Sequence, residues 1–315
     1  MYPFRTMLFA ADFSEDSTQA FRLAGSLAVE NKTRIVVLHV LEPNLVVEEP
    51  VYLGQTTMQF YNAGRDEAQY ESIKRKLGEV YIPGHAIDVE YHTREGHAAE
   101  EILRMADEVG ADLIVMGTHG RTGLRRLLAG SVAATVLRGA HCPVLALRSG
   151  NRPRPAEEMR VLLHPTDFSD GCEAALRVAR SLARDLGARL IVLHILPFDL
   201  YLEGRMATGL DPQGYHDSLD MIRQRLDGPD LKQPVETRLC RGYEAEEILR
   251  MAQELEADLI VMGTHGWSGL GRLLMGSTAE SVLSRADCPV LVVKASRSEA
   301  APTPVRAAVE AEIVP

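Results

Sequence analysis

Short apolar segments alternate with longer amphipathic segments along the whole chain. In the first half, five short segments are rich in Val, Ile and Leu, as buried strands are, and cover residues 7–11, 34–40, 87–91, 112–117 and 144–147. Segments with apolar residues at helical spacing, such as residues 97–109, lie between them. Strands that alternate with helices predict an α/β fold, in which helices cover both faces of a parallel sheet.

The second half of the chain repeats the first. Strands are predicted near Val161, Ile191, Val235, Ile260 and Val290. Residues 96–120 and 242–266 are identical at 20 of 25 positions. Such similarity at a fixed offset indicates an internal duplication.

The duplication and the length of 315 residues both predict two domains. We place the first domain at residues 1–148, a linker rich in proline at residues 149–158, and the second domain at residues 159–295. Residues 296–315 are rich in Ala, Pro and Glu, a composition that predicts a disordered tail.

Topology predicts where each domain binds a ligand. We expect each domain to be a doubly wound, five-stranded parallel sheet of order 3-2-1-4-5, in which the first and fourth strands are neighbours. Asp12 follows the first strand and Gly117 ends the fourth, and Asp167 and Gly263 hold the same places in the second half. Because ligands bind outside the carboxyl ends of such strands, each pair predicts one binding crevice.

A glycine motif occurs once in each predicted crevice. The first copy has Gly117, Gly120 and then Gly130-Ser131, and the second has Gly263, Gly266 and then Gly276-Ser277. Glycines let the backbone approach an anion closely, and the N–H groups of a helix that starts at the serine favour phosphate oxygens. The Asp carboxylates suit hydrogen bonds from ribose hydroxyls or a base amino group. Val40 and Ile195, which end the second strands, are placed to wall an adenine.

At these motifs the chain resembles the universal stress protein family, in its tandem, ATP-binding branch. The nucleotide motif of that family is Gly, two residues, Gly, nine residues, then Gly followed by Ser or Thr, and both copies match it in full. The resemblance implies a Rossmann-like fold of the adenine nucleotide alpha hydrolase type. It also implies that the last strands, residues 144–147 and 290–293, pair within the chain as a pseudo-dimer, and it leaves a further homodimer open.

The resemblance assigns binding roles to particular residues. Those expected to contact the nucleoside are Asp12, Val40, Met116, Gly117, Asp167, Ile195, Met262 and Gly263. Those expected to bind phosphates are Gly120, Gly130, Ser131, Val132, Gly266, Gly276, Ser277 and Thr278. One departure from the family pattern is Ala10-Ala11 before Asp12, where the second half has the more usual Pro165-Thr166.

Several polar residues near the glycine motifs have two interpretations. His119 and His265 lie within the motifs, where they would touch phosphates, act as acid or base, or only hydrogen-bond within a turn. Arg121 lies in the first motif and would contact phosphate or form an exposed face, and Trp267 replaces it in the second. The two sites are therefore expected to differ in affinity.

Composition limits the function classes. The net charge of −10 disfavours nucleic acid binding, and no apolar run approaches the roughly 18 residues of a membrane span. The first ten residues lack the pattern of a secretory leader, which predicts a cytoplasmic protein. Four cysteines in so long a chain predict neither a disulfide framework nor a metal site.

The sequence favours a binding and regulatory module over an enzyme. It contains no Walker-type phosphate loop, no Gly-x-Ser-x-Gly elbow and no His-Glu-x-x-His zinc pair. We therefore predict a stress-response regulator that binds one ATP per domain, with or without Mg²⁺, and acts on an unknown protein partner. The alternatives are a scaffold that works without nucleotide and a slow ATPase.

Overall fold

The computed structural model describes residues 4–29, 33–41, 88–118, 131–148, 150–151, 153–196, 235–264 and 275–294. In the first half, the elements are β1 (Thr6–Ala10), α1 (Glu15–Val29), β2 (Arg34–Leu41), β3 (Val89–Glu95), α3 (Ala98–Val109), β4 (Leu113–Gly117), α4 (Ser131–Gly139) and β5 (Val144–Leu147). In the second half, they are the short 3-10 helix η1 (Ala156–Glu158), β6 (Val161–Thr166), α5 (Asp170–Leu186), β7 (Arg189–Leu196), β8 (Val235–Arg241), α7 (Glu244–Glu254), β9 (Leu259–Gly263), α8 (Ser277–Arg285) and β10 (Val290–Val293).

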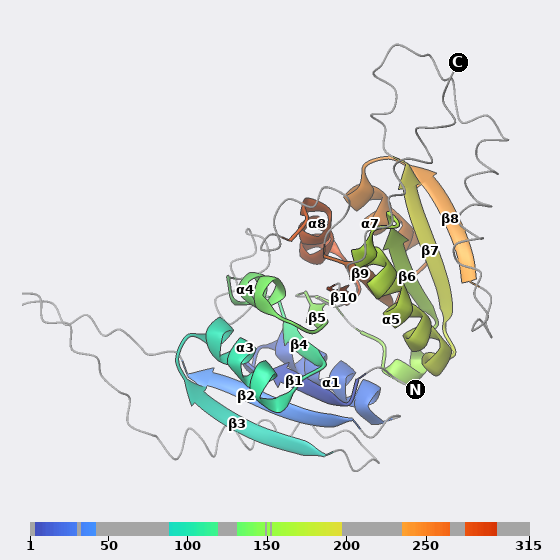
Figure 1. The fold of residues 1–315 in the computed structure, drawn as a ribbon. Helices are drawn as coiled ribbons and strands as arrows, with labels where there is room; N and C mark the ends of the chain where they lie inside the picture. Colours follow the sequence, from blue (N-terminus) through green and yellow to red (C-terminus); the bar gives the residue numbers. More distant parts are fainter. Residues whose placement is uncertain are drawn as a thin grey trace, which may run out of the picture.

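The two halves share one ten-stranded sheet of order β3-β2-β1-β4-β5-β10-β9-β6-β7-β8 (Figure 1). Each half has the predicted order 3-2-1-4-5 with parallel neighbours, which confirms the doubly wound fold. The halves join where β5 and β10 pair antiparallel, with Leu145 opposite Leu291. The last strands therefore pair within the chain, and each protects the edge of the other.

Helices cover both faces of this sheet. Strand residues such as Met7 and Phe9 point toward α1 and α5 and form one apolar layer, which runs through both halves. Leu8 and Ile114 point the other way, toward α3, α4, α7 and α8. Because both faces are buried, strands such as β4 are apolar at almost every position, as the sequence suggested.

The third strand is longer than the apolar pattern predicted. We expected it at residues 87–91, whereas β3 runs from Val89 to Glu95. The prediction stopped early because β3 is an edge strand of the described sheet, where the polar run His92–Glu95 reaches solvent while its backbone pairs with β2. A search for apolar runs therefore misses the polar end of such an edge strand. The predicted tail, residues 296–315, lies outside the described residues.

Two basic side chains at equivalent positions link the halves reciprocally. Arg148, directly after β5, donates from Nε to the Ala286 carbonyl oxygen at 3.0 Å and forms an ion pair with Asp287. Lys294, directly after β10, donates from Nζ to the carbonyl oxygens of Arg138 at 2.6 Å and Ala140 at 2.8 Å. Each cation satisfies carbonyl groups at the C-terminal end of a helix in the other half, where the helix dipole favours positive charge.

Candidate functional site

The predicted first crevice is at the carboxyl ends of β1 and β4, and the turn through Asp12 lies at this edge of the sheet. The Oδ1 atom of Asp12 accepts hydrogen bonds from the backbone N–H of Ser14 at 2.9 Å and from its hydroxyl at 2.6 Å. The Ser14 hydroxyl oxygen in turn accepts from the N–H of Ser17 at 3.1 Å, which caps α1. The carboxylate is therefore held beside the N-terminus of α1, with its position set by the backbone.

A histidine at the end of β2 supports the same turn. The Nδ1 atom of His39 lies 2.6 Å from the carbonyl oxygen of Ala11, so Nδ1 is assigned as the protonated donor. The ring centroids of His39 and Phe13 are 4.5 Å apart. Phe13 has a φ of 61°, in the left-handed region that non-glycine residues rarely adopt. The imidazole thus braces a strained turn that orients Asp12.

The second crevice, at the carboxyl ends of β6 and β9, repeats this arrangement. Asp167 Oδ1 accepts from the Ser169 N–H at 2.9 Å, and Phe168 has a φ of 63°. The Nδ1 atom of His194 lies 2.8 Å from the Thr166 carbonyl oxygen, and its ring centroid lies 5.0 Å from that of Phe168. The duplicated halves thus keep the same strained turn at equivalent positions, directly after β1 and β6.

Glycines end β4 and β9 because a helix N-terminus approaches each of them. A Cβ atom added at Gly263 would lie 2.9 Å from the carbonyl carbon of Gly171 and 3.2 Å from the nitrogen of Cys172, both in the first turn of α5. At Gly117 the contact is looser, since a Cβ would lie 3.4 Å from the Asp16 Cβ. The glycines therefore let α1 and α5 begin directly beside the ends of β4 and β9.

The N-terminus of α8 returns to the same place in the second crevice. The backbone N–H of Gly276, which caps α8, donates to the carbonyl oxygen of Thr264 at 2.9 Å. Thr264 directly follows Gly263, the last residue of β9. Four features thus meet at one edge of the sheet: the Asp167 turn, the start of α5, the end of β9 and the N-terminus of α8.

A family model for the universal stress protein family matches residues 3–148 and 159–294. The chain belongs to the universal stress protein family. Similar curated relatives include a universal stress protein of Methanocaldococcus jannaschii, 36% identical over 141 residues that cover 43% of this chain and 82% of that protein. Another, from Mycolicibacterium smegmatis, is 26% identical over 300 residues, covering 91% of this chain and 96% of that protein.

A solved structure shares the tandem fold. The crystal structure of a universal stress protein from Archaeoglobus fulgidus matches with a TM-score of 0.66 and 20% identity, over 94% of this chain and all of that one. Because the sequences are only 20% identical, this similarity concerns the fold alone. The shared fold agrees with the sheet of two halves described above.

The predicted site residues of this universal stress protein fall into two groups. Those at strand ends or at the starts of α4 and α8, with described backbones, are Asp12, Val40, Met116, Gly117, Ser131, Val132, Asp167, Ile195, Met262, Gly263, Gly276, Ser277 and Thr278. Those outside the described residues are His119, Gly120, Arg121, Gly130, His265 and Gly266. Within the first group, Met116 and Met262 are also buried members of the core layer under α3, α4, α7 and α8.

Two residues that bear on the second crevice were not singled out from the sequence. Cys172 replaces Ser17 of the first half, and burial, with the nearby Asp167 carboxylate, raises the pKa of its thiol to about 12. The thiol is therefore protonated at neutral pH and a poor nucleophile. Glu244, the first residue of α7, accepts a hydrogen bond from the predicted phosphate ligand Thr278. The sequence signal for Glu244 was the difference from Ala98, which stands at the equivalent position of the first repeat.

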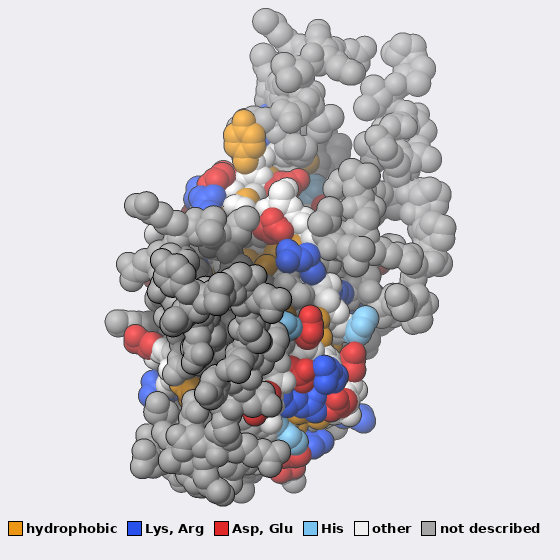
Figure 2. All heavy atoms as spheres, turned by 90° about the vertical axis from the view of Figure 1, so that its left-hand side faces the viewer, with side chains coloured by type: hydrophobic (Ala, Val, Ile, Leu, Met, Phe, Trp, Pro, Cys, Tyr) orange, Lys and Arg blue, Asp and Glu red, His pale blue; other side chains and the backbone are white. Residues whose placement is uncertain are grey.

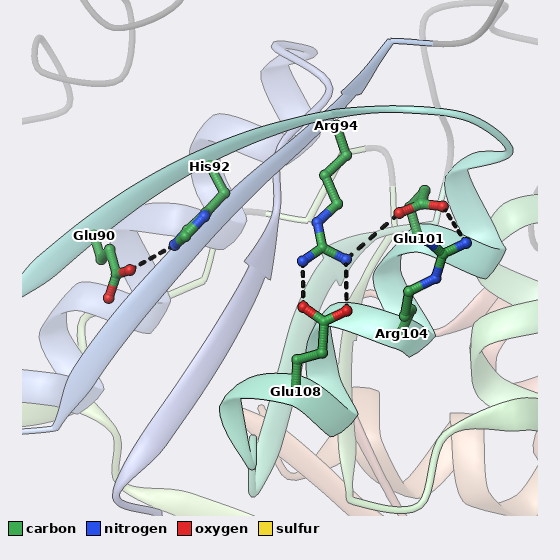
Figure 3. A network of polar contacts seen from close by, with 6 residues as sticks. All are labelled: Glu90, His92, Arg94, Glu101, Arg104 and Glu108. Carbon is green, nitrogen blue, oxygen red and sulfur yellow. Dashed lines mark hydrogen bonds and ion pairs between the residues drawn. The ribbon is translucent and has the colours of Figure 1, made fainter.

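Beside the first crevice, an ion-pair network ties β3 to α3 (Figure 3). Arg94 on β3 pairs with Glu108 and lies 3.5 Å from Glu101, which also pairs with Arg104 at 2.7 Å. In the second half Cys240 takes the place of Arg94. The network anchors the turn through Gly96 that leads into α3, and Figure 2 shows red and blue side chains interspersed on this side of the molecule.

Among the described helices, none is long and apolar enough to cross a membrane.

Proposed function

We propose that this universal stress protein is a regulatory protein that binds one adenine nucleotide in each half, at the first and second crevices. The nucleotide is ATP, with or without Mg²⁺, and its occupancy controls an interaction with a protein partner. Adenine lies against the ends of β2 and β7, ribose against the Asp turns, and the phosphates at the glycine motifs and the N-termini of α4 and α8.

The observation that carries this proposal is the Gly276 to Thr264 hydrogen bond together with the duplicated motif. The 2.9 Å bond sets the N-terminus of α8 beside the end of β9, within the crevice that Asp167 borders. Backbone N–H groups at a helix N-terminus attract anions, and the strand-end carboxylate suits hydroxyl groups rather than anions. A ligand with a sugar at one end and phosphates at the other fits that division.

The Asp turns offer a direct test. Asn at position 12 or 167 keeps a carbonyl oxygen for the Ser14 or Ser169 N–H but removes the charge that strengthens hydrogen bonds from ribose hydroxyls. We expect D12N and D167N each to weaken ATP binding at one site by about tenfold, since a hydrogen bond to a charged group contributes about 1.5–3 kcal/mol.

Isothermal titration calorimetry with ATP would resolve the two sites. D107A is the control, because Asp107 is exposed near the C-terminal end of α3, and its counterpart in the second half is Gln253. If D12N and D167N bind ATP as the wild type does, the Asp turns do not contact the nucleotide. A wild-type chain that shows no heat of ATP binding would instead favour the scaffold.

A further inference from the structure

A carboxylate occupies the N-terminus of α8, where the proposed function places phosphates. The hydroxyl Oγ1 of Thr278 donates to Oε2 of Glu244 at 2.6 Å. Thr278 is the second residue of α8, directly after Ser277, so the carboxylate lies against the first turn of the helix. A negative charge there receives the stabilisation by the helix dipole that a phosphate would otherwise use.

Glu244 reaches this position from the turn that leads from β8 into α7. It begins α7, which follows β8, and the N–H of Gly242 donates to the Leu196 carbonyl oxygen at the end of β7 at 3.1 Å. The turn into α7 therefore lies next to the strand end that is proposed to wall the adenine. Glu244 spans from that side of the crevice to the phosphate side.

A second contact holds α7 against α8. Arg285 forms a bidentate pair with Glu246, with nitrogen to oxygen distances of 2.6 and 2.7 Å. Bidentate Arg–carboxylate pairs fix geometry as well as charge. This pair and the contact between Glu244 and Thr278 both join α7 to α8, and they keep the Glu244 carboxylate near the start of α8.

The first half provides an internal comparison, because it keeps Glu100 in place of Glu246 but lacks the other three groups. Ala98 stands in place of Glu244, Val132 in place of Thr278 and Gly139 in place of Arg285. The first turn of α4 contains no acidic residue, whereas Glu280 lies in the first turn of α8. The two crevices therefore share the Asp turn and the glycine motif but differ in charge at the phosphate end.

We infer that Glu244 sets the phosphate selectivity of the second site, so that this site favours nucleotides with fewer phosphate charges than the first site does. The inference rests on the proposed function. Repulsion between the carboxylate and the ligand grows with each phosphate charge, whereas contacts to the nucleoside stay the same. The preference for ATP over AMP is thus weaker at the second site than at the first.

The test measures the ratio of the dissociation constants for ATP and AMP at the second site, by calorimetry without divalent cations in a D12N background. We expect E244A to lower this ratio about tenfold, because it removes one charge within a few ångströms of the phosphates. E254A is the matched control: Glu254 carries the same charge at the other end of α7, where it pairs with Arg250. It should leave the ratio unchanged.

The reciprocal double variant A98E/V132T, studied in a D167N background, places the same pair at the first site. It should raise the ratio there about tenfold. An unchanged ratio in both E244A and A98E/V132T, with ATP and AMP still bound, would overturn the role of Glu244 and leave the proposed function standing. Failure of the wild-type chain to bind either nucleotide would instead refute the proposed function.

Discussion

Replacing the buried His164 by phenylalanine should make the fold more resistant to acid. His164 lies on β6 with none of its surface exposed, and its Nδ1 lies 2.8 Å from the Val261 carbonyl oxygen. Among the described residues its Nε2 has no hydrogen-bond partner. The first half has Phe9 at the equivalent position, packed on Phe21 at 4.9 Å, so the fold accepts an aromatic hydrocarbon here.

The magnitude follows from the pKa of the imidazole. The pKa of His164 is lowered from 6.5 to about 4, chiefly by burial and also by the Arg180 charge, while the hydrogen bond to the Val261 carbonyl and the Asp167 charge oppose the shift. Because the unfolded chain binds the proton more readily, His164 leaves the free energy of unfolding unchanged above about pH 6.5 and lowers it as the pH falls toward 4. The loss amounts to about 3 kcal/mol, at about 1.4 kcal/mol for each pKa unit.

Urea unfolding followed by circular dichroism between pH 7.5 and 4 would measure this loss. The free energy of unfolding of H164F should fall less steeply than that of the wild type, by up to about 3 kcal/mol over the range. H164L serves as a second variant if the larger ring does not pack, and H141F is the control because His141 is exposed. Equal pH dependence in the wild type and both His164 variants would refute the reasoning.

Three further predictions concern single positions. G263A should displace the start of α5, weaken nucleotide binding at the second site and lower the free energy of unfolding by about 1–3 kcal/mol. G117A has more room for the added methyl group and should lower it less. Equal effects of the two variants in calorimetry and urea unfolding would show that the close approach is unimportant. E256G should stabilise the protein by about 1 kcal/mol, because Glu256 holds a left-handed φ of 49° where the first half has Gly110; an unchanged melting temperature would contradict this. K294A should lower the free energy of unfolding by about 1–2 kcal/mol, because it leaves the carbonyl groups of Arg138 and Ala140 without this donor, and K294R should recover part of the loss. Equal stability of K294A and the wild type in urea unfolding would argue against the link between the halves.

Sequence reasoning predicted the sheet well because its strands are buried on both faces. The run Leu113–Met116 is apolar at every position, and only a central strand between two helix layers requires that. The pairing of β5 with β10 was likewise expected from the duplication and the family resemblance, and the structure adds that it is antiparallel. The same criterion missed part of an edge strand, because the end of β3 is polar.

The positions of the candidate site residues were predictable at the strand ends and less so across helices. Asp12 and Asp167 were selected from topology, because each follows a strand that neighbours the strand leading into a glycine motif. The contact between Glu244 and Thr278 joins two residues that are 34 positions apart in sequence and lie on different helices, and neither belongs to a strand. Only the packing of α7 against α8 brings Glu244 and Thr278 together. The mismatch between Glu244 and Ala98 in the repeat therefore marked Glu244 but did not identify its partner.

The most direct test of nucleotide binding is to count the nucleotide that the protein retains. Purified chain would be incubated with millimolar Mg-ATP, freed of unbound ligand by rapid gel filtration and denatured, and the released adenine nucleotide would be quantified by liquid chromatography and mass spectrometry. The account predicts nucleotide in the wild type, reduced by D12N and further reduced when D167N is added. A wild-type chain that retains none, and shows no heat of ATP binding in calorimetry, would contradict it.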